Sequence, residues 1–477
     1  MNEPATGTIT TVRDTVAAGR ATAEQAVVAA LDLIDRHNPR LNAVVALRAD
    51  LALAEARDLD ARLRAGEPAG PLAGVPVLVK DLEDVAGMRT TQGSFLFADA
   101  SPAEADGLVP SRLRRAGAIV VGKTNLPEFA TEGYTSNLVF GTTRNPWALD
   151  WSPGGSSGGS AAALAAGLAP IATATDGGGS IRIPAASCGL LGIKPTNGLI
   201  GRRPIPDWID LSTDGPLATT VEDLRLLLSV EAGPIAGDPT ALSTWAPTVA
   251  RTLPPRALAA PRLVPWGPLP GPVATAFEQA LAAFADALGV RVEPIEPEGV
   301  FRTGNLDEDW FVLATAEHVA RLGRATVKAN LERMHPAARA FMEQGLAIGI
   351  DEYLAARRRR FGYVRELDEL LGDEGIVLTP TVATEGFPAD GRLEPGGEPQ
   401  MLPPDAFTTA VQNMTGHPAI SLPAGRLRNG VPFGLMATAP RFRDDLLLGL
   451  AAAWEAAQPW PRIAPGYRPF EAALGLA

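Results

Sequence analysis

Two glycine- and serine-rich segments are the part of this sequence best suited to chemistry. Residues 154–160 read Gly-Gly-Ser-Ser-Gly-Gly-Ser, and residues 176–182 read Asp-Gly-Gly-Gly-Ser-Ile-Arg. Such runs often form flexible linkers, but an alanine-rich, helix-forming stretch follows the first of them at residues 161–168. We therefore interpret both segments as backbone that must approach a bound group closely, with N–H groups directed at a negative charge.

Phosphate binding is the first chemistry to consider. Residues 117–124, Gly-Ala-Ile-Val-Val-Gly-Lys-Thr, match the pattern G-x-x-x-x-G-K-[ST]. Their four middle positions have the composition of a strand, whereas a phosphate loop follows its strand with open, glycine-rich backbone. We therefore reject phosphate binding at this segment.

A serine–histidine–acid triad is the second possibility. Residues 154–158 match the G-x-S-x-G pattern of a nucleophile elbow, which is a sharp turn directly after a strand. Residues 145–153 precede it here, with two prolines and no β-branched run. The triad also needs a histidine to take the serine proton. The four histidines are scattered, and we interpret them as structural or exposed: His37, His318, His335 and His417.

A serine activated by a lysine is the third possibility. The chain has only four lysines against 38 arginines, and lysine, unlike arginine, loses its proton readily when buried. Lys80 ends the apolar run at residues 75–79, and a neutral amine there would take a proton from a serine directly or through a second serine. The consecutive N–H groups of Gly177, Gly178, Gly179 and Ser180 would stabilise the oxyanion formed when Ser180 attacks a carbonyl. The residue types alone leave open the alternative of a buried structural Lys–Asp pair with glycine turns.

The elements that would position these residues alternate between helix and strand. Helical spacing predicts helices at residues 22–38, with Thr22 as the cap, and at residues 51–65. Short apolar runs predict strands at residues 74–81, 118–121 and 169–175, with a helix near 111–116. Further on we expect helices at 272–288, 309–371 and 444–457, and strands at 375–379, 419–423 and 432–437. This alternation is typical of the α/β class.

The chain shows no internal repeat and no clear linker, so we expect a single domain over residues 1–477. Residues 234–272 are rich in proline and alanine, which indicates a long surface connection. Residues 385–404 contain many glycines and prolines and are a candidate for a mobile flap beside a site.

Composition limits the partners. The 477 residues carry 54 acidic and 42 basic side chains, a net charge of −12, which argues against a nucleic-acid partner. Cys188 is the single cysteine, and the histidines lack metal-ligand spacing, so we expect no disulfide, no metal and no cofactor. Neither a secretory signal nor a membrane span is visible, and we expect a cytoplasmic protein.

The sequence resembles the amidase signature family of serine hydrolases. The resemblance rests on Lys80, on the run at residues 154–160, on residues 176–184, and on the 24-residue offset from Ser156 to Ser180. It extends over residues 74–81, 122–129, 141–147, 188–195, 214–216, 413–418 and 432–436. The resemblance implies a central twisted mixed β-sheet flanked by α-helices. It also implies a signature core over about residues 70–230 and a variable helical and loop region over about 234–405 that would form part of the substrate pocket.

The resemblance also implies roles for the catalytic residues. Ser180 would be the nucleophile, Ser156 the bridging serine held by a cis Gly155–Ser156 peptide, and Lys80 the base that later returns the proton to the leaving amine. Gly177, Gly178, Gly179 and Ser180 would form the oxyanion hole.

Further positions follow from the same resemblance. Ser157, Asp176 and Arg182 would hold the site in shape, and Ala130 and Thr131 fall where relatives line the acyl pocket. Tyr134 lies in a substrate-facing segment that varies across the family. The chain departs from the family at Gly177, where relatives usually carry a larger residue.

Members of this family hydrolyse amide bonds through an acyl-enzyme, and some cleave carbamates (urethanes) or esters. We expect a small-molecule amide or carbamate substrate and a monomer or homodimer. The aromatic residues Tyr134, Trp208 and Trp310, with residues 385–404, favour a largely apolar substrate. The alternative is the A subunit of a glutamyl-tRNA amidotransferase, which shares these motifs. The acidic charge and the weak match over residues 234–405 argue against it. The presence of Lys80, Ser156 and Ser180 argues against a non-enzymatic binding protein.

Overall fold

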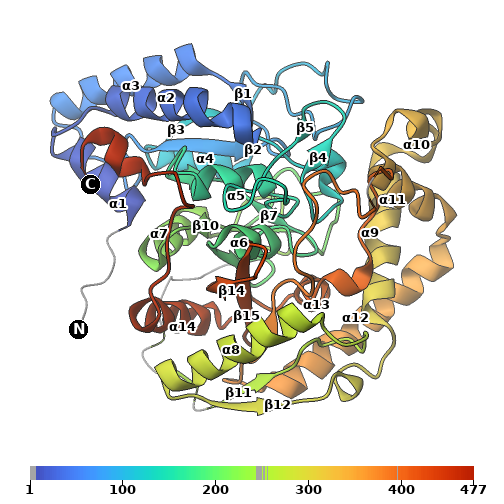
Figure 1. The fold of residues 1–477 in the computed structure, drawn as a ribbon. Coiled ribbons are helices and arrows are strands. Elements are labelled where there is room, and N and C mark those ends of the chain that lie inside the picture. Colours follow the sequence, from blue (N-terminus) through green and yellow to red (C-terminus); the bar gives the residue numbers. More distant parts are fainter. Residues whose placement is uncertain (1–6, 243–249, 251–252, 255, 395, 477) are drawn as a thin grey trace.

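Strands in the computed structural model form two mixed sheets that meet near the centre of the molecule (Figure 1). The model describes residues 7–242, 250, 253–254, 256–394 and 396–476. One sheet has four strands in the order β1-β3-β2-β6: Val44–Leu47, Ile119–Thr124, Pro76–Lys80 and Ile171–Ala172. The other has seven strands in the order β10-β8-β14-β15-β13-β11-β12: Leu217–Ala218, Leu191–Lys194, Ala419–Arg426, Pro432–Thr438, Val377–Pro380, Arg256–Ala259 and Arg291–Pro294.

A short antiparallel pair joins the two sheets. β7 (Thr175–Asp176) follows β6 after two residues, and β9 (Thr213–Asp214) precedes β10 by two residues. Thr175 pairs with Asp214 and Asp176 with Thr213. The predicted strand at residues 169–175 is thus two short strands, and the second of them lies where the sheets meet.

Helices cover both sheets. The N-terminal helices α1 (Thr8–Ala17), α2 (Ala23–Leu41) and α3 (Ala49–Arg64) lie beside the four-stranded sheet (Figure 1). Thr22 caps α2 through a capping box with Gln25, as its spacing predicts. Helix α4 (Leu108–Arg115) also packs against β3 of the four-stranded sheet. Around the remainder lie α7 (Val221–Glu231), α8 (Gly271–Leu288), α13 (Ala410–Thr415) and α14 (Asp444–Ala457). The α/β class with mixed sheets and flanking helices is therefore confirmed.

The expected helix at residues 309–371 is broken into several. It comprises α9 (Leu306–Leu322), α10 (Arg324–Asn330), α11 (Pro336–Ala347) and α12 (Ile350–Leu371). Gly323, with φ 87°, separates α9 from α10, and Pro336 begins α11 because proline fits the first helical turn. The prediction of a surface connection at residues 234–272 missed β11, which is largely buried. Part of that connection, residues 243–249, 251–252 and 255, lies outside the described residues.

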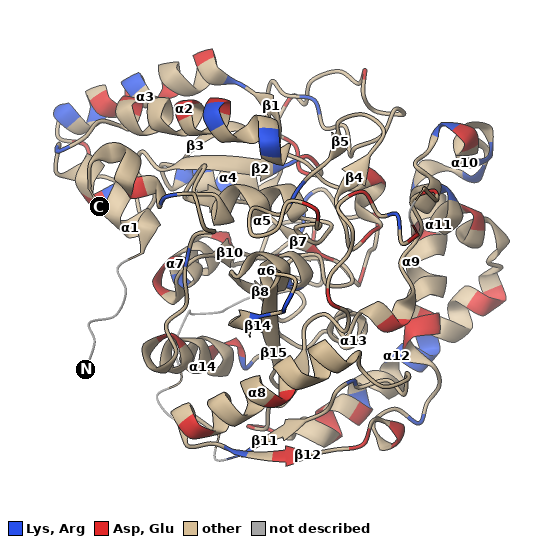
Figure 2. Ribbon diagram, viewed as in Figure 1, with Lys and Arg blue, Asp and Glu red and all other residues tan. Residues whose placement is uncertain are grey.

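Two short helices sit at the centre with no exposed face. Every residue of α5 (Gly158–Ala165) and α6 (Arg182–Cys188) is buried. Charged residues occur along α2, α3 and α12, whereas α5 carries none (Figure 2). Because α5 and α6 begin within the two glycine- and serine-rich segments, packing of these helices fixes both segments in the core. No helix within the described ranges is long and apolar enough to cross a bilayer.

Candidate active site

Lys80 lies at the end of strand β2 and is fully buried. Its Nζ lies 2.8 Å from Ser156 Oγ, 2.9 Å from Ser157 Oγ and 2.8 Å from Thr175 Oγ1. Burial lowers the pKa of Lys80 to about 7, despite the opposing effect of nearby carboxylates. The amine is therefore substantially neutral near pH 7 and is surrounded by hydroxyl groups that it can deprotonate.

Asp81, the next residue, does not form a structural pair with Lys80. Its carboxylate lies 3.4 Å from Lys123 Nζ instead. Lys123 is buried on β3, and the middle of its phosphate-loop pattern, residues 119–121, belongs to the same strand. Rejection of a phosphate loop there agrees with this structure.

Ser156 occupies a backbone position that requires its glycine neighbours. The Gly155–Ser156 peptide is cis, and Gly154 has φ 83°. A Cβ on Gly155 would lie 2.4 Å from the carbonyl oxygen of Glu132 and 2.7 Å from that of Tyr134. These contacts are with backbone, so the position excludes any larger residue.

Asp176 and Arg182 form a wholly buried ion pair beneath Ser180. Arg182 Nη2 lies 2.9 Å from Asp176 Oδ1, and Nε lies 2.9 Å from Oδ2. Burial alone would raise the pKa of Asp176, but the Arg182 guanidinium and the Asn413 amide hold it at about 2. Arg182 also donates to Gln412 Oε1 and Asn413 Oδ1, each at 2.7 Å. The pair therefore ties the segment before Ser180 to helix α13.

Two side chains hold the loop at residues 177–180 by donating hydrogen bonds to its carbonyl groups. Trp310 Nε1 donates to the Gly177 carbonyl (2.9 Å), and Thr409 Oγ1 donates to the Gly178 carbonyl (2.6 Å). The Gly179 N–H donates to Asp176 Oδ1 at 2.7 Å, which corrects its expected place in the oxyanion hole. The N–H groups of Gly177, Gly178 and Ser180 have no protein partner among the described residues. These three remain available to an oxyanion.

Two cavities meet at Ser180. The larger, of about 690 Å³, is also lined by Ser156, Thr175 and Gly177. The smaller, of about 60 Å³, is lined by Ser180 but not by Ser156. Both cavities share the lining residues Ala130, Ser180 and Trp208. A group attacked by Ser180 would thus extend in two directions.

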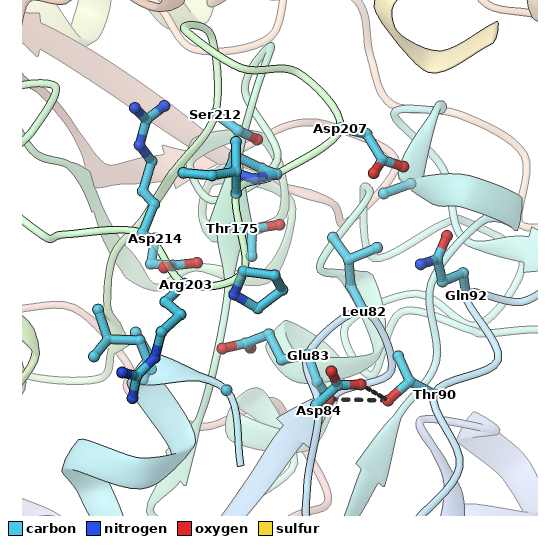
Figure 3. Close-up of a pocket in the computed structure, with 18 of the residues that line it drawn as sticks. Leu82, Glu83, Asp84, Thr90, Gln92, Thr175, Arg203, Asp207, Ser212 and Asp214 are labelled. Carbon is cyan, nitrogen blue, oxygen red and sulfur yellow. Dashed lines mark hydrogen bonds between the residues drawn. The ribbon is translucent and has the colours of Figure 1, made fainter. Parts of the chain in front are cut away.

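Charged side chains give the larger cavity a polar wall. Figure 3 shows Glu83, Asp84, Asp207, Asp214 and Arg203 around it. Trp208 lines both cavities and Trp310 the smaller one, as expected of an apolar pocket. The expectation of a largely apolar substrate therefore fits the described lining of the smaller cavity better than that of the larger one.

The predicted pocket residues have different outcomes. Ala130 and Thr131 line the smaller cavity. Of the segment 131–134 that was expected to face the substrate, Thr131, Glu132 and Gly133 line the smaller cavity. Tyr134 itself is fully buried, lines neither of these two cavities, and its hydroxyl donates to the Gln400 carbonyl (3.1 Å). A Cβ on Gly391 would overlap the Tyr134 ring, so the ring packs directly against the segment 385–404. Residues 401, 402 and 404 of that segment line the smaller cavity, while residue 395 lies outside the described residues.

Sequence reasoning assigned no role to Thr175 or to the carboxyl groups near Lys80. Burial and the neighbouring Asp214 raise the pKa of Glu83 to about 8, and burial raises that of Asp214 to about 6. The only sequence signal for Thr175 was its position directly before Asp176 in the signature.

The histidines were expected to be structural or exposed rather than catalytic. His318 departs from this expectation in part, because it lines the larger cavity, where its Nε2 lies 3.4 Å from Asp207 Oδ2. No histidine contacts Ser156 or Ser180 through a hydrogen bond in the described ranges.

Comparison with known proteins gives consistent matches. A family model described as Amidase matches residues 25–448. An acylamidase from Rhodococcus erythropolis is 33% identical over 461 residues, covering 93% of this chain and 94% of the relative. The glutamyl-tRNA(Gln) amidotransferase A subunit from Picosynechococcus sp. is 33% identical, covering 91% and 94%. The crystal structure of a bacterial aryl acylamidase of the amidase signature family superposes with a TM-score of 0.85 at 29% identity, covering 94% of this chain and 96% of the other.

Proposed function

This chain belongs to the amidase family and has the amidase signature fold, and from that premise we propose that it hydrolyses small-molecule amides through an acyl-enzyme on Ser180. The observation that carries the proposal is the 2.8 Å approach of the buried Lys80 Nζ to Ser156 Oγ, beside a cavity that Ser156 and Ser180 share. A neutral amine in that position supplies the base that a serine nucleophile needs.

The proton moves in two linked transfers. Ser156 Oγ gives its proton to Lys80 Nζ and takes the proton of Ser180 Oγ, which attacks the carbonyl carbon of the amide. The negative charge that develops on the carbonyl oxygen faces the N–H groups of Gly177, Gly178 and Ser180, and such preorganised donors stabilise the tetrahedral intermediate. When the C–N bond breaks, the proton returns from Lys80 through Ser156 to the leaving nitrogen. Water then hydrolyses the ester on Ser180 by the same route.

Each of the two cavities would bind one part of the substrate. The leaving group must lie near Ser156, which delivers its proton, and Ser156 lines only the larger of the two cavities. The acyl group then occupies the smaller cavity. Aryl and acyl amides suit this arrangement, and carbamates (urethanes) and esters would follow the same chemistry, with the enzyme acting as a monomer or homodimer.

A second candidate is the A subunit of a glutamyl-tRNA amidotransferase. It is supported by the equal identity, 33%, of an acylamidase and of one such amidotransferase chain to this protein. The formal charge of −12 argues against an RNA partner. Glutaminase activity and association with partner subunits distinguish it from an amidase.

Hydrolysis of a substrate panel tests the proposal. The panel contains an aryl anilide, a fatty amide, a phenyl carbamate, a p-nitrophenyl ester and glutamine. Wild type is compared with Ser180→Ala and with the exposed control Ser229→Ala. Loss of activity in Ser180→Ala alone supports the acyl-enzyme, whereas undiminished activity would contradict it. Activity on glutamine alone would favour the amidotransferase.

A further inference from the structure

The smaller cavity combines apolar walls with two acidic side chains. Aromatic rings line it: Trp208, Trp310, Phe311 and Phe407. Glu132 and Asp307 are the titratable groups of its described lining, which contains no lysine, arginine or histidine. An apolar cavity with carboxyl groups and no basic residue is unsuited to an anion, and uncharged acyl chains do not require the carboxyl groups.

Glu132 carries an oxygen that lacks a partner. The residue is 6% exposed, and its Oε2 accepts a hydrogen bond from the backbone N–H of Leu402 (3.2 Å), which lines the same cavity. Its Oε1 is buried and has no hydrogen-bond partner in the described part of the chain. Burying an unpaired carboxyl oxygen is unfavourable. A polar group on a bound ligand would satisfy it.

Asp307 provides the second carboxyl group from the first turn of α9. It is 8% exposed, and its Oδ2 accepts from Trp266 Nε1 (2.6 Å). The nearby Arg262 is outside the described lining, and its guanidinium donates to the carbonyls of Gly267 and Asp405. Burial raises the pKa of Asp307 to about 6 and that of Glu132 to about 8. A cation beside these two carboxyl groups would favour the ionised form of both.

We propose that the smaller cavity binds a short acyl group that ends in a primary ammonium, held by Glu132 and Asp307 among the aromatic rings. Carboxylates and aromatic faces are the groups that recognise an ammonium in a desolvated site. A volume of about 60 Å³, against roughly 10–15 Å³ for one water, admits only a few non-hydrogen atoms. Aminoacyl amides of the size of glycyl or β-alanyl amides are the substrate class. This inference rests on the proposed function, because it places the acyl half of an amide in this cavity.

A matched pair of substrates isolates the ammonium. β-Alanine 4-nitroanilide and butyric acid 4-nitroanilide have the same number of non-hydrogen atoms and differ only by NH₃⁺ in place of CH₃. A hydrogen-bonded charge pair predicts that wild type prefers the β-alanyl compound by about 10- to 100-fold in kcat/KM. Glu132→Gln, which keeps the shape and removes the charge, should lower that ratio by about tenfold, and Asp307→Asn should lower it in the same direction. Because the readout is a ratio within one enzyme preparation, partial unfolding of a variant cancels.

Binding to the inactive enzyme tests the cavity without turnover. Calorimetry with Ser180→Ala should show tighter binding of β-alaninamide than of butyramide, and Glu132→Gln in the same background should reduce the difference by about tenfold. A wild-type preference for butyryl, or ratios unchanged in both acidic-residue variants, would overturn the ammonium site. Failure to cleave either anilide, or cleavage that survives Ser180→Ala, would instead contradict the proposed function, and the calorimetric comparison would still decide the inference.

Discussion

The backbone N–H of Ser157 donates a hydrogen bond to the carbonyl oxygen of Ser180 at 3.3 Å. This bond joins the two glycine- and serine-rich segments, which are separated in the chain by α5, β6 and β7. The neighbouring Ser157 Oγ lies 2.9 Å from Lys80 Nζ, so the same residue contacts both the proposed base and the proposed nucleophile. Small displacements of either segment would therefore be transmitted to the proton route, and the predictions below test its members separately.

Replacement of Lys80 by methionine should slow catalysis strongly without unfolding the protein. Methionine is similar in length and apolar, so it suits a fully buried position, but it cannot accept a proton. Since a positioned general base contributes about 10²–10⁴-fold, kcat/KM should fall by that factor in Lys80→Met. The exposed Lys328→Met is the control. Circular dichroism checks the fold, and a well-folded Lys80→Met enzyme with wild-type activity would exclude this base.

The pH profile of kcat/KM should rise through about pH 7. Burial lowers the pKa of Lys80 to about 7, and only its neutral form accepts the serine proton. Below that value each unit of pH should reduce the neutral fraction, and hence the rate, by about tenfold. A profile measured from pH 5 to 9 with an uncharged anilide checks this, and a rate that is flat from pH 5.5 to 8 would contradict it.

Asp214→Asn should move this profile to lower pH. The Asp214 carboxylate favours the protonated form of Lys80, so its removal lowers the pKa of the amine further. The matched control is Asp84→Asn, which also lines the larger cavity but is not among the groups that shift Lys80. Because Asp214 also raises the pKa of Glu83, whose carboxylate acts on Lys80 in the same sense, Glu83→Gln is combined with Asp214→Asn. An unchanged midpoint in the double variant would show that another group controls the profile.

Those parts of the site that depend on local sequence were predictable. The apolar run that ends at Lys80 forms a strand with that end. Asp176 and Arg182 are six residues apart, at the end of β7 and the start of α6, and only a short loop separates them. Long-range packing was not predictable. Tyr134 falls in a segment that was expected to face the substrate, but residues more than 250 positions later cover its side chain. The smaller cavity is likewise assembled from segments between residues 130 and 410, and no local pattern marks it.

Asp176→Asn should destabilise the whole protein. The substitution leaves the fully buried Arg182 guanidinium without its counter-charge, and removing one partner of a buried pair costs about 3–5 kcal/mol. Urea denaturation checks this against Asp58→Asn, whose ion pair with Arg62 is exposed. Asp176 has a folded-state pKa of about 2, below its usual value, so its stabilisation is present above the unfolded pKa and is lost as pH falls through about 2. The difference in unfolding free energy between wild type and Asp176→Asn should therefore shrink in acid, and a constant difference down to pH 2 would contradict the assignment.

Gly155→Ala should lower activity more than the same substitution at a glycine with open space around it. The new Cβ would lie 2.4 Å from the Glu132 carbonyl oxygen and 2.7 Å from that of Tyr134, and neither backbone group is a flexible side-chain end. Relief of this overlap must move the Gly155–Ser156 peptide, and with it the Ser156 hydroxyl that lies 2.8 Å from Lys80 Nζ. Overpacking of this kind costs about 1–3 kcal/mol, and displacement of a reacting group by about 1 Å can cost about 10²-fold in rate. Gly267→Ala is the matched control, because its Cβ would have no atom within 4 Å. Thermal unfolding and kcat/KM, measured on the same samples, separate the effect on stability from the effect on catalysis. A lower melting temperature with full activity in Gly155→Ala would show that the overlap does not displace Ser156. Loss of activity in Gly267→Ala as well would point to a general effect of added bulk.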